Sequence, residues 1–95
     1  MKNIDLTKYA PVFSNEDIGK AVFSEIMESL KTEDGVLIDM TGIKSMATCC
    51  SKQVFGELYK RLGPVDFYKR VTIKGATENV KVIIRLGIKY VIENN

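Results

Sequence analysis

The sequence predicts an α/β sandwich of about four strands with helices mainly on one face. Residues 36–38 form a continuous apolar run, which is typical of a buried central strand. The segment before them has an apolar stripe at i, i+4 spacing, which indicates an amphipathic helix and consists of Ile18, Val22, Ile26 and Leu30. A helix between two strands is the crossover of a β-α-β unit, so we expect the first two strands to be parallel.

The first helix has a recognisable beginning and end. Ser14 is the expected N-cap, and Asp17 stands three residues later, where it completes a capping box. Phe13 and Ile18 occupy the two positions of a hydrophobic staple around this cap. Gly35 follows the helix and is free to take a positive φ, so we expect the helix to end there.

Three strands are predicted along the chain, at residues 3–9, 35–40 and 71–73. The first lies at an edge of the sheet, and the second lies at its centre with both faces covered. Residues 67–68 either extend the third strand or cover a loop before it. The side chains that we expect in the core are Ile18, Val22, Ile26, Leu37, Val54, Leu58, Ile73, Val80 and Ile84.

Apolar periodicity predicts two further helices. One covers residues 49–62 and stops at residues 63–64, a Gly-Pro pair. The other begins at Thr77 and meets a glycine at Gly87. The helix either continues through this glycine into residues 88–92 or ends at it, which makes those residues a short final strand or an extended tail. Their β-branched and aromatic character favours the break.

The size of the chain limits what it can be. It has 95 residues, of which 45% are hydrophobic, and we expect residues 1–95 to form one small domain. The N-terminal residues have no apolar stretch typical of a secretory segment, and no apolar run approaches the ~18 residues of a membrane span. We therefore expect no secretory segment and a cytoplasmic protein. A domain of this size gains stability from a symmetric dimer, and we expect a monomer or a homodimer.

Charge is distributed unevenly along the chain. Residues 1–51 hold five Lys and eight acidic residues, and residues 52–95 hold nine basic and four acidic residues, so the two parts carry −3 and +5. This asymmetry gives an alternative function, a small nucleotide- or nucleic-acid-binding domain that uses the basic C-terminal half. The charges are spread rather than clustered, so a solvated surface is the simpler interpretation and no specific nucleic acid is expected.

Residues 35–62 contain the strongest candidate for a functional site. A buried strand, a tight turn and a new helix follow one another, and Thr48 places a hydroxyl where the helix begins. Free N–H groups at a helix start hold anions, including a phosphate attached to that hydroxyl, although a plain N-cap is the simpler interpretation of Thr48. Asp39 ends the strand, where it either binds a cation or, more simply, caps an Asx turn at residues 41–42.

The two cysteines follow Thr48 directly. Adjacent Cα atoms lie about 3.8 Å apart, closer than the roughly 4.4–6.8 Å of a disulfide, so we expect free thiols. Cys49 stands in the first helical turn, which lowers the pKa of some thiols, but small buried hydrophobes are the simpler interpretation of both Cys49 and Cys50. The sequence contains no His, so we expect no metal site, no cofactor and no catalytic role.

Two parts of the chain resemble a known family. Residues 37–55 resemble the strand-to-helix segment of STAS domains, the fold of bacterial anti-sigma-factor antagonists, in which an Asp-Ser-Ser-Gly motif opens a helix shortly after an apolar strand. Residues 73–75 and 80–88 resemble the strand, helix and closing Gly-Leu of the same fold. The closer resemblance is to a STAS-like family of unknown function, whose apolar-Phe-Gly step is matched by residues 54–56.

The resemblance implies a STAS-like sandwich with a mixed sheet and a non-catalytic regulatory module that binds another protein. Residues 47–50, Ala-Thr-Cys-Cys, stand where the antagonists have Asp-Ser-Ser-Gly, and Thr48 keeps the hydroxyl of the phosphorylated position. The candidate partner-binding or phospho-acceptor residues are therefore Thr48, Cys49, Ser51 and Lys52. The implied partner is an anti-sigma factor or a serine/threonine kinase of the histidine-kinase ATPase type.

Overall fold

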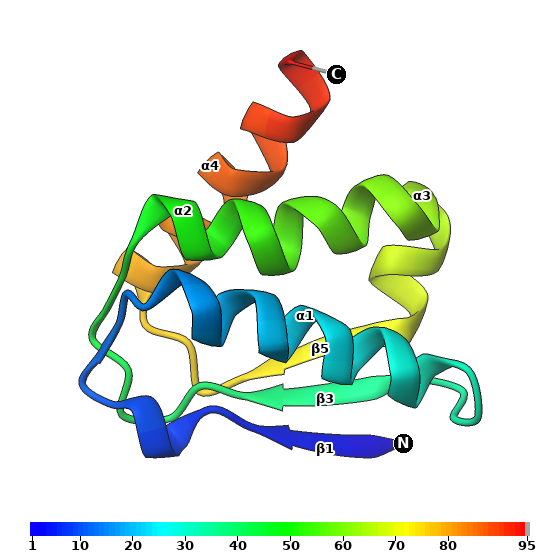
Figure 1. Ribbon diagram of the computed structural model, residues 1–95, viewed down its shortest axis with the longest axis horizontal. Coiled ribbons are helices and arrows are strands. Elements are labelled where there is room, and N and C mark those ends of the chain that lie inside the picture. The colour runs from blue at the N-terminus through cyan, green and yellow to red at the C-terminus, as the bar shows by residue number, and fades with distance from the viewer. Residues whose placement is uncertain (95) are drawn as a thin grey trace.

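The computed structural model describes residues 1–94 and contains two small parallel sheets (Figure 1). In the larger sheet, β3 (Val36–Asp39) lies between β1 (Lys2–Asp5) and β5 (Val71–Lys74), and both pairs are parallel. In the smaller sheet, β2 (Val12–Phe13) pairs in parallel with β4 (Ser45–Met46). The predicted central strand, the third strand and the parallel pairing of the first two strands are confirmed.

The expected mixed sheet of about four strands is wrong, because the described strands form a three-stranded and a two-stranded sheet with parallel pairs throughout. The first strand is also shorter than the predicted residues 3–9. It ends at Asp5, and a 3₁₀ turn, η1 (Thr7–Tyr9), follows. The Asp5 carboxylate accepts hydrogen bonds from the backbone N–H of Thr7 at 2.8 Å and from its hydroxyl at 2.5 Å, which turns the chain.

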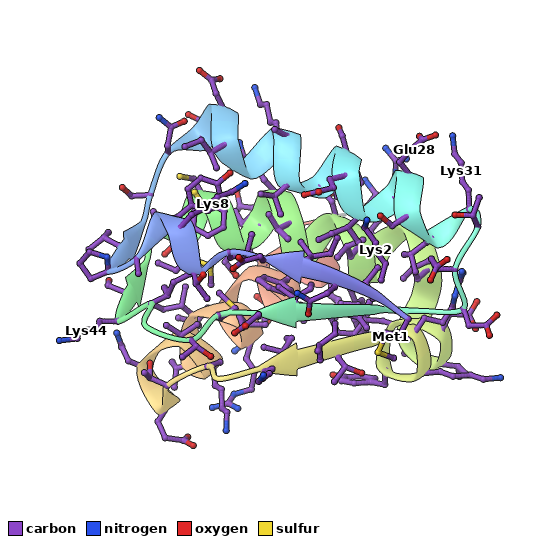
Figure 2. The ribbon with its side chains drawn as sticks, turned by 90° about the horizontal axis from the view of Figure 1, so that it is seen from below. Met1, Lys2, Lys8, Glu28, Lys31 and Lys44 are labelled. Atoms are coloured by element: carbon purple, nitrogen blue, oxygen red, sulfur yellow. The ribbon has the colours of Figure 1, made fainter. Side chains whose placement is uncertain are left out.

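The larger sheet is covered by helices on one face only. Ile4, Ile38 and Ile73 share a row in the register and face the helices. Asn3, Leu37 and Thr72 form a row on the opposite face, where only Leu37 is partly covered. Figure 2 shows the molecule from this side. The prediction that both faces of the central strand are covered is therefore wrong.

Helix α1 (Glu16–Leu30) begins one residue later than predicted. Its N-cap is Asn15, whose side-chain oxygen accepts a hydrogen bond from the Ile18 N–H at 3.0 Å. The expected cap at Ser14, and the capping box that Asp17 would complete, are wrong. Asn and Ser are caps of similar strength, so the adjacent Asn15 can take the role that we assigned to Ser14.

The C-terminal end of α1 is held by a residue far along the chain. Arg70 donates hydrogen bonds to the carbonyls of Leu30 at 2.7 Å, Glu33 at 3.2 Å and Asp34 at 3.0 Å. Gly35 does not take the expected positive φ. A Cβ at Gly35 would lie 2.7 Å from the Arg70 carbonyl oxygen, so glycine is required here for a close approach of two backbones.

A long helical segment follows β4. It consists of α2 (Thr48–Ser51), the π-helical η2 (Lys52–Gly56) and α3 (Glu57–Arg70), which follow one another without a break as far as Gly63. Gly63, with φ of 81°, interrupts the helix as predicted, and the helix resumes at the following proline in a new direction. Residues 67–68 are helical and neither extend a strand nor cover a loop, so both predictions for them are wrong.

The last helix, α4 (Glu78–Glu93), runs through Gly87, so the predicted break and the final strand at residues 88–92 are wrong. Thr77 is its N-cap, so the helix begins one residue after the predicted start at Thr77. Gly87 contacts another helix instead of ending its own. A Cβ at Gly87 would collide with the hydroxyl of Ser51 and lie 2.8 Å from the Ser51 carbonyl carbon. A Cβ at Gly56 would lie 2.9 Å from the Gly87 carbonyl oxygen.

The core lies between the sheet and the helices. Of the nine side chains that we expected there, Val22, Ile26, Val54, Leu58, Val80 and Ile84 are buried. The other three, Ile18, Leu37 and Ile73, are half-buried. Among the described residues, Ser51 is the one buried polar side chain, and its hydroxyl donates a hydrogen bond to the Ile83 carbonyl at 2.7 Å.

We predict that Gly87→Ala destabilises the protein, although alanine is the better helix former by about 1 kcal/mol. The added methyl group meets Ser51, and moving the helices apart costs about 1–3 kcal/mol. Urea unfolding followed by circular dichroism measures the change. Leu86→Ala, at the neighbouring exposed position, is the control and should change stability by less than about 0.5 kcal/mol. A Gly87→Ala protein more stable than wild type would show that this crossing is not tight.

Candidate functional site

The helical segment that contains Thr48 begins without a side-chain cap. Ala47 is the N-cap residue, and its methyl group accepts no hydrogen bond. The N–H groups of Cys50 and Ser51 bond to the Ala47 carbonyl at 3.1 Å each. Within residues 1–94, the N–H groups of Thr48 and Cys49 have no hydrogen-bond acceptor. These two groups are therefore donors that solvent or a ligand must satisfy.

Thr48 is the first residue of this helix and not its cap, so the plain-cap interpretation is wrong. Its side chain is exposed, and its hydroxyl makes no hydrogen bond to other described residues. The helix start therefore offers an accessible hydroxyl beside free N–H groups. A phosphate on that hydroxyl would meet the positive end of the helix.

The two cysteines have different environments. Both are free thiols, and Cys49 is exposed while Cys50 is buried. The Cys50 thiol donates a hydrogen bond to the Asn15 carbonyl at 3.4 Å. Burial, with a smaller contribution from neighbouring Cys49, raises the pKa of Cys50 to about 12, so its thiol stays protonated at neutral pH. Cys50 is thus a core residue, and Cys49 is not the buried hydrophobe that we expected.

Ser51 and Lys52 point in different directions. Ser51 is fully buried under α4 and offers no atom to a partner. The Lys52 ammonium lies 3.5 Å from the centroid of the Tyr90 ring, a cation–π contact that joins η2 to α4. Of the four candidate site residues, the structure therefore leaves Thr48 and Cys49 exposed, Lys52 half-buried and Ser51 buried.

An exposed apolar stripe lies on α4, the helix that packs against α2 and η2. Val82, Leu86 and Tyr90 follow one another at i, i+4 spacing, with 45%, 48% and 47% of their surfaces exposed. Lys52 contacts the last of them. We call the combined area the α2–α4 surface, and it consists of Thr48, Cys49, Lys52, Val82, Leu86 and Tyr90. The sequence interpretation missed the stripe because it ended the last helix at Gly87.

Asp39 caps a turn, as the simpler interpretation predicted. One of its carboxylate oxygens accepts hydrogen bonds from the Thr41 N–H at 3.0 Å and from the Thr41 hydroxyl at 2.7 Å. These bonds lower the pKa of Asp39, so the carboxylate is ionised at neutral pH. Within residues 1–94, no three His, Cys, Asp or Glu side chains come together as a metal-binding group would require.

Comparison with known proteins identifies the family. A family model described as a STAS-like domain of unknown function matches residues 18–81, from the start of α1 to the first turn of α4. The chain belongs to this family. The STAS-like resemblance of the sequence is thereby confirmed. Neither a curated protein nor a solved structure matches the chain. No helix of residues 1–94 is long and apolar enough to cross a membrane.

The first prediction for this site concerns thiol reactivity. At pH 8, iodoacetamide should modify Cys49 in the folded protein and leave Cys50 intact, because Cys50 is buried and its raised pKa keeps the thiol protonated. Intact-mass spectrometry should show one added group before unfolding in urea and two afterwards. Cys49→Ser is the control and should take up none while folded. Fast modification of Cys50 would contradict its burial.

The second prediction concerns the helix start. Thr48→Ala should change the free energy of unfolding by less than about 0.5 kcal/mol, because no hydrogen bond of the Thr48 side chain is lost. Thr77→Ala is the matched control at a true N-cap, where the threonine hydroxyl accepts from the Val80 N–H at 3.1 Å. The control should cost about 1 kcal/mol. Equal costs at both positions would mean that Thr48 does cap its helix.

Proposed function

We propose that this STAS-like protein is a non-catalytic regulatory module that binds another protein through the α2–α4 surface. The observation that carries the proposal is the exposed apolar stripe on α4, which packs against the uncapped α2 and is joined to the following turn by the Lys52–Tyr90 contact. Three large apolar side chains in one row on a helix are a larger exposed patch than isolated surface hydrophobes, and such patches mark interaction sites. Tyr90 is an aromatic side chain of the kind that is enriched in interfaces, and its cation–π contact with Lys52 holds the ring in place.

The position of Thr48 supports control by a charge. A phosphate there would gain about 0.3–1 kcal/mol from the helix N-terminus, so the folded module would tolerate it. The same group would bring up to about two negative charges into a docked interface, where they are costly to desolvate. Phosphorylation of Thr48 would therefore release the partner without unfolding the protein.

The partner class comes from the resemblance to anti-sigma-factor antagonists. It is an anti-sigma factor or a serine/threonine kinase of the histidine-kinase ATPase type. Such a kinase would be a single partner that both binds the α2–α4 surface and phosphorylates Thr48. A catalytic role finds less support, because the chain contains no His and the buried Cys50 thiol stays protonated.

The alternative function, nucleic-acid binding by the basic C-terminal half, is less well supported by the structure. Several of its cations are already engaged: Arg70 with three carbonyls, Lys52 with Tyr90 and Lys81 with Glu78 at 3.4 Å. Non-specific nucleic-acid binding depends on a row of cations that can face phosphates. A salt-dependent complex with DNA or RNA that is sub-micromolar at physiological salt would favour the alternative.

We predict that Thr48→Glu and Leu86→Ser each weaken the native partner complex at least tenfold. The first places a charge in the proposed interface, and the second removes the middle side chain of the exposed apolar stripe. The measurement is a quantitative affinity pull-down from the native cell, followed by titration of the purified partner. The melting temperature of both variants should stay within a few degrees of wild type.

Thr72→Glu is the matched control for this experiment, because Thr72 is exposed on the open face of the sheet. It should bind like wild type. If Thr48→Glu and Leu86→Ser retained every partner at wild-type affinity, the α2–α4 surface would not be the docking site.

A further inference from the structure

A second apolar feature lies on the other side of α4. Tyr59 and Tyr68 of α3 and Ile88 and Ile92 of α4 line a hollow of about 260 Å³. A second hollow of about 260 Å³ adjoins it, shares Tyr59 and Ile92, and is completed by Pro64 among others. We call the two hollows the aromatic groove. The last turns of α4, which form one wall, extend beyond the other helices (Figure 1).

The groove is separate from the α2–α4 surface. Ile88 and Ile92 each stand two positions after a member of the exposed stripe, which places them roughly 200° further around the helix axis. Tyr59 and Tyr68 belong to α3, well after the start of α2. The groove thus uses none of the residues through which the proposed function acts.

The aromatic wall of the groove packs on the core and is still open to solvent. Tyr68 packs edge-on against Phe67, with ring centroids 5.2 Å apart, and Tyr59 packs against the same Phe67 at 5.5 Å. Phe67 itself is buried, so it anchors both tyrosines to the core. Yet Tyr68 is 71% exposed and Ile92 is 54% exposed. A preformed apolar hollow with exposed walls binds a side chain at a low cost in conformational entropy.

The rim of the groove is positively charged. Arg85 and Lys89, one turn apart on α4, flank the first hollow, and Lys60 flanks the second. Within residues 1–94, neither Arg85 nor Lys60 has an ion-pair partner. The Lys89 ammonium forms an ion pair with the Glu93 carboxylate at 3.9 Å. Three cations against one carboxylate favour an acidic occupant. They also disfavour a second copy docked across a two-fold axis, which would set these cations against one another.

We propose that the aromatic groove binds an acidic segment of a partner protein. One large aliphatic or aromatic side chain of that segment enters between Tyr59, Tyr68 and Ile92, and its flanking carboxylates face Arg85 and Lys89. A single-stranded nucleic acid fits less well, because stacking needs open ring faces and a line of cations. Here Tyr59 packs against two other rings, and Glu93 lies in the groove wall.

The test is selection from a display library of random twelve-residue peptides against the purified protein, with sequencing of the enriched pool. Wild type should enrich peptides of net negative charge that contain Leu, Ile, Phe or Trp. A fluorescein-labelled peptide from that pool should bind Arg85→Glu and Ile92→Ser at least tenfold more weakly than wild type. Its affinity should also fall as salt is added, because the rim charges are exposed.

Thr48→Glu and Leu86→Ser are the matched controls on the other side of α4, and both should bind the peptide like wild type. Circular dichroism and melting temperature should show that all variants are folded, since each changed side chain is exposed. The proposal is overturned if no acidic peptides are enriched, or if Arg85→Glu and Ile92→Ser bind the peptide as wild type does. Tighter binding of a fluorescein-labelled oligothymidine that depends on the same two residues would assign the groove to nucleic acid.

Discussion

The crossing of α4 over α2 and η2 determines where every candidate surface of this protein lies. The buried Ser51 hydroxyl donates to the Ile83 carbonyl at 2.7 Å, which satisfies the one polar side chain in the core of the described residues. Gly56 and Gly87 leave room for the two backbones to touch. Because the helices approach so closely, α4 is held by a narrow strip along one side. Its two flanks stay exposed, and they carry the α2–α4 surface and the aromatic groove.

The parts of the fold that the sequence predicted depend on local signals. The apolar run of the central strand, the interruption at Gly63 and the Asx turn at Asp39 each follow from a few neighbouring residues. The parts that it missed depend on distant contacts. A glycine at position 87 predicted a helix stop, but it is there because Ser51 leaves no room for a Cβ. A glycine at position 35 predicted a positive φ, but it is there because the Arg70 carbonyl leaves no room for a Cβ. Nothing in the adjacent sequence distinguishes a glycine that ends a helix from one that allows a helix to be crossed.

The candidate site shows the same division. The strand-turn-helix pattern located Thr48 at a helix start, but the shift of the cap to Ala47 depends on backbone geometry. The burial of Ser51 could have been predicted, because Ser51 precedes the buried Val54 and Leu58 at i+3 and i+7 spacing on one helical face. The exposed stripe on α4 also follows from i, i+4 spacing, provided that the helix is assumed to continue through Gly87.

The open face of the sheet explains why binding is expected on the helical side. A parallel sheet usually has both faces covered, and here the uncovered face carries polar side chains such as Asn3, Thr72 and Lys74 around the half-buried Leu37. That face meets water without exposing a large apolar patch. Much of the exposed apolar area instead lies along α4 and the end of α3. A partner that gains from apolar burial is therefore expected to approach the helices, where α4 carries the apolar stripe on one side and the cation-rimmed groove on the other.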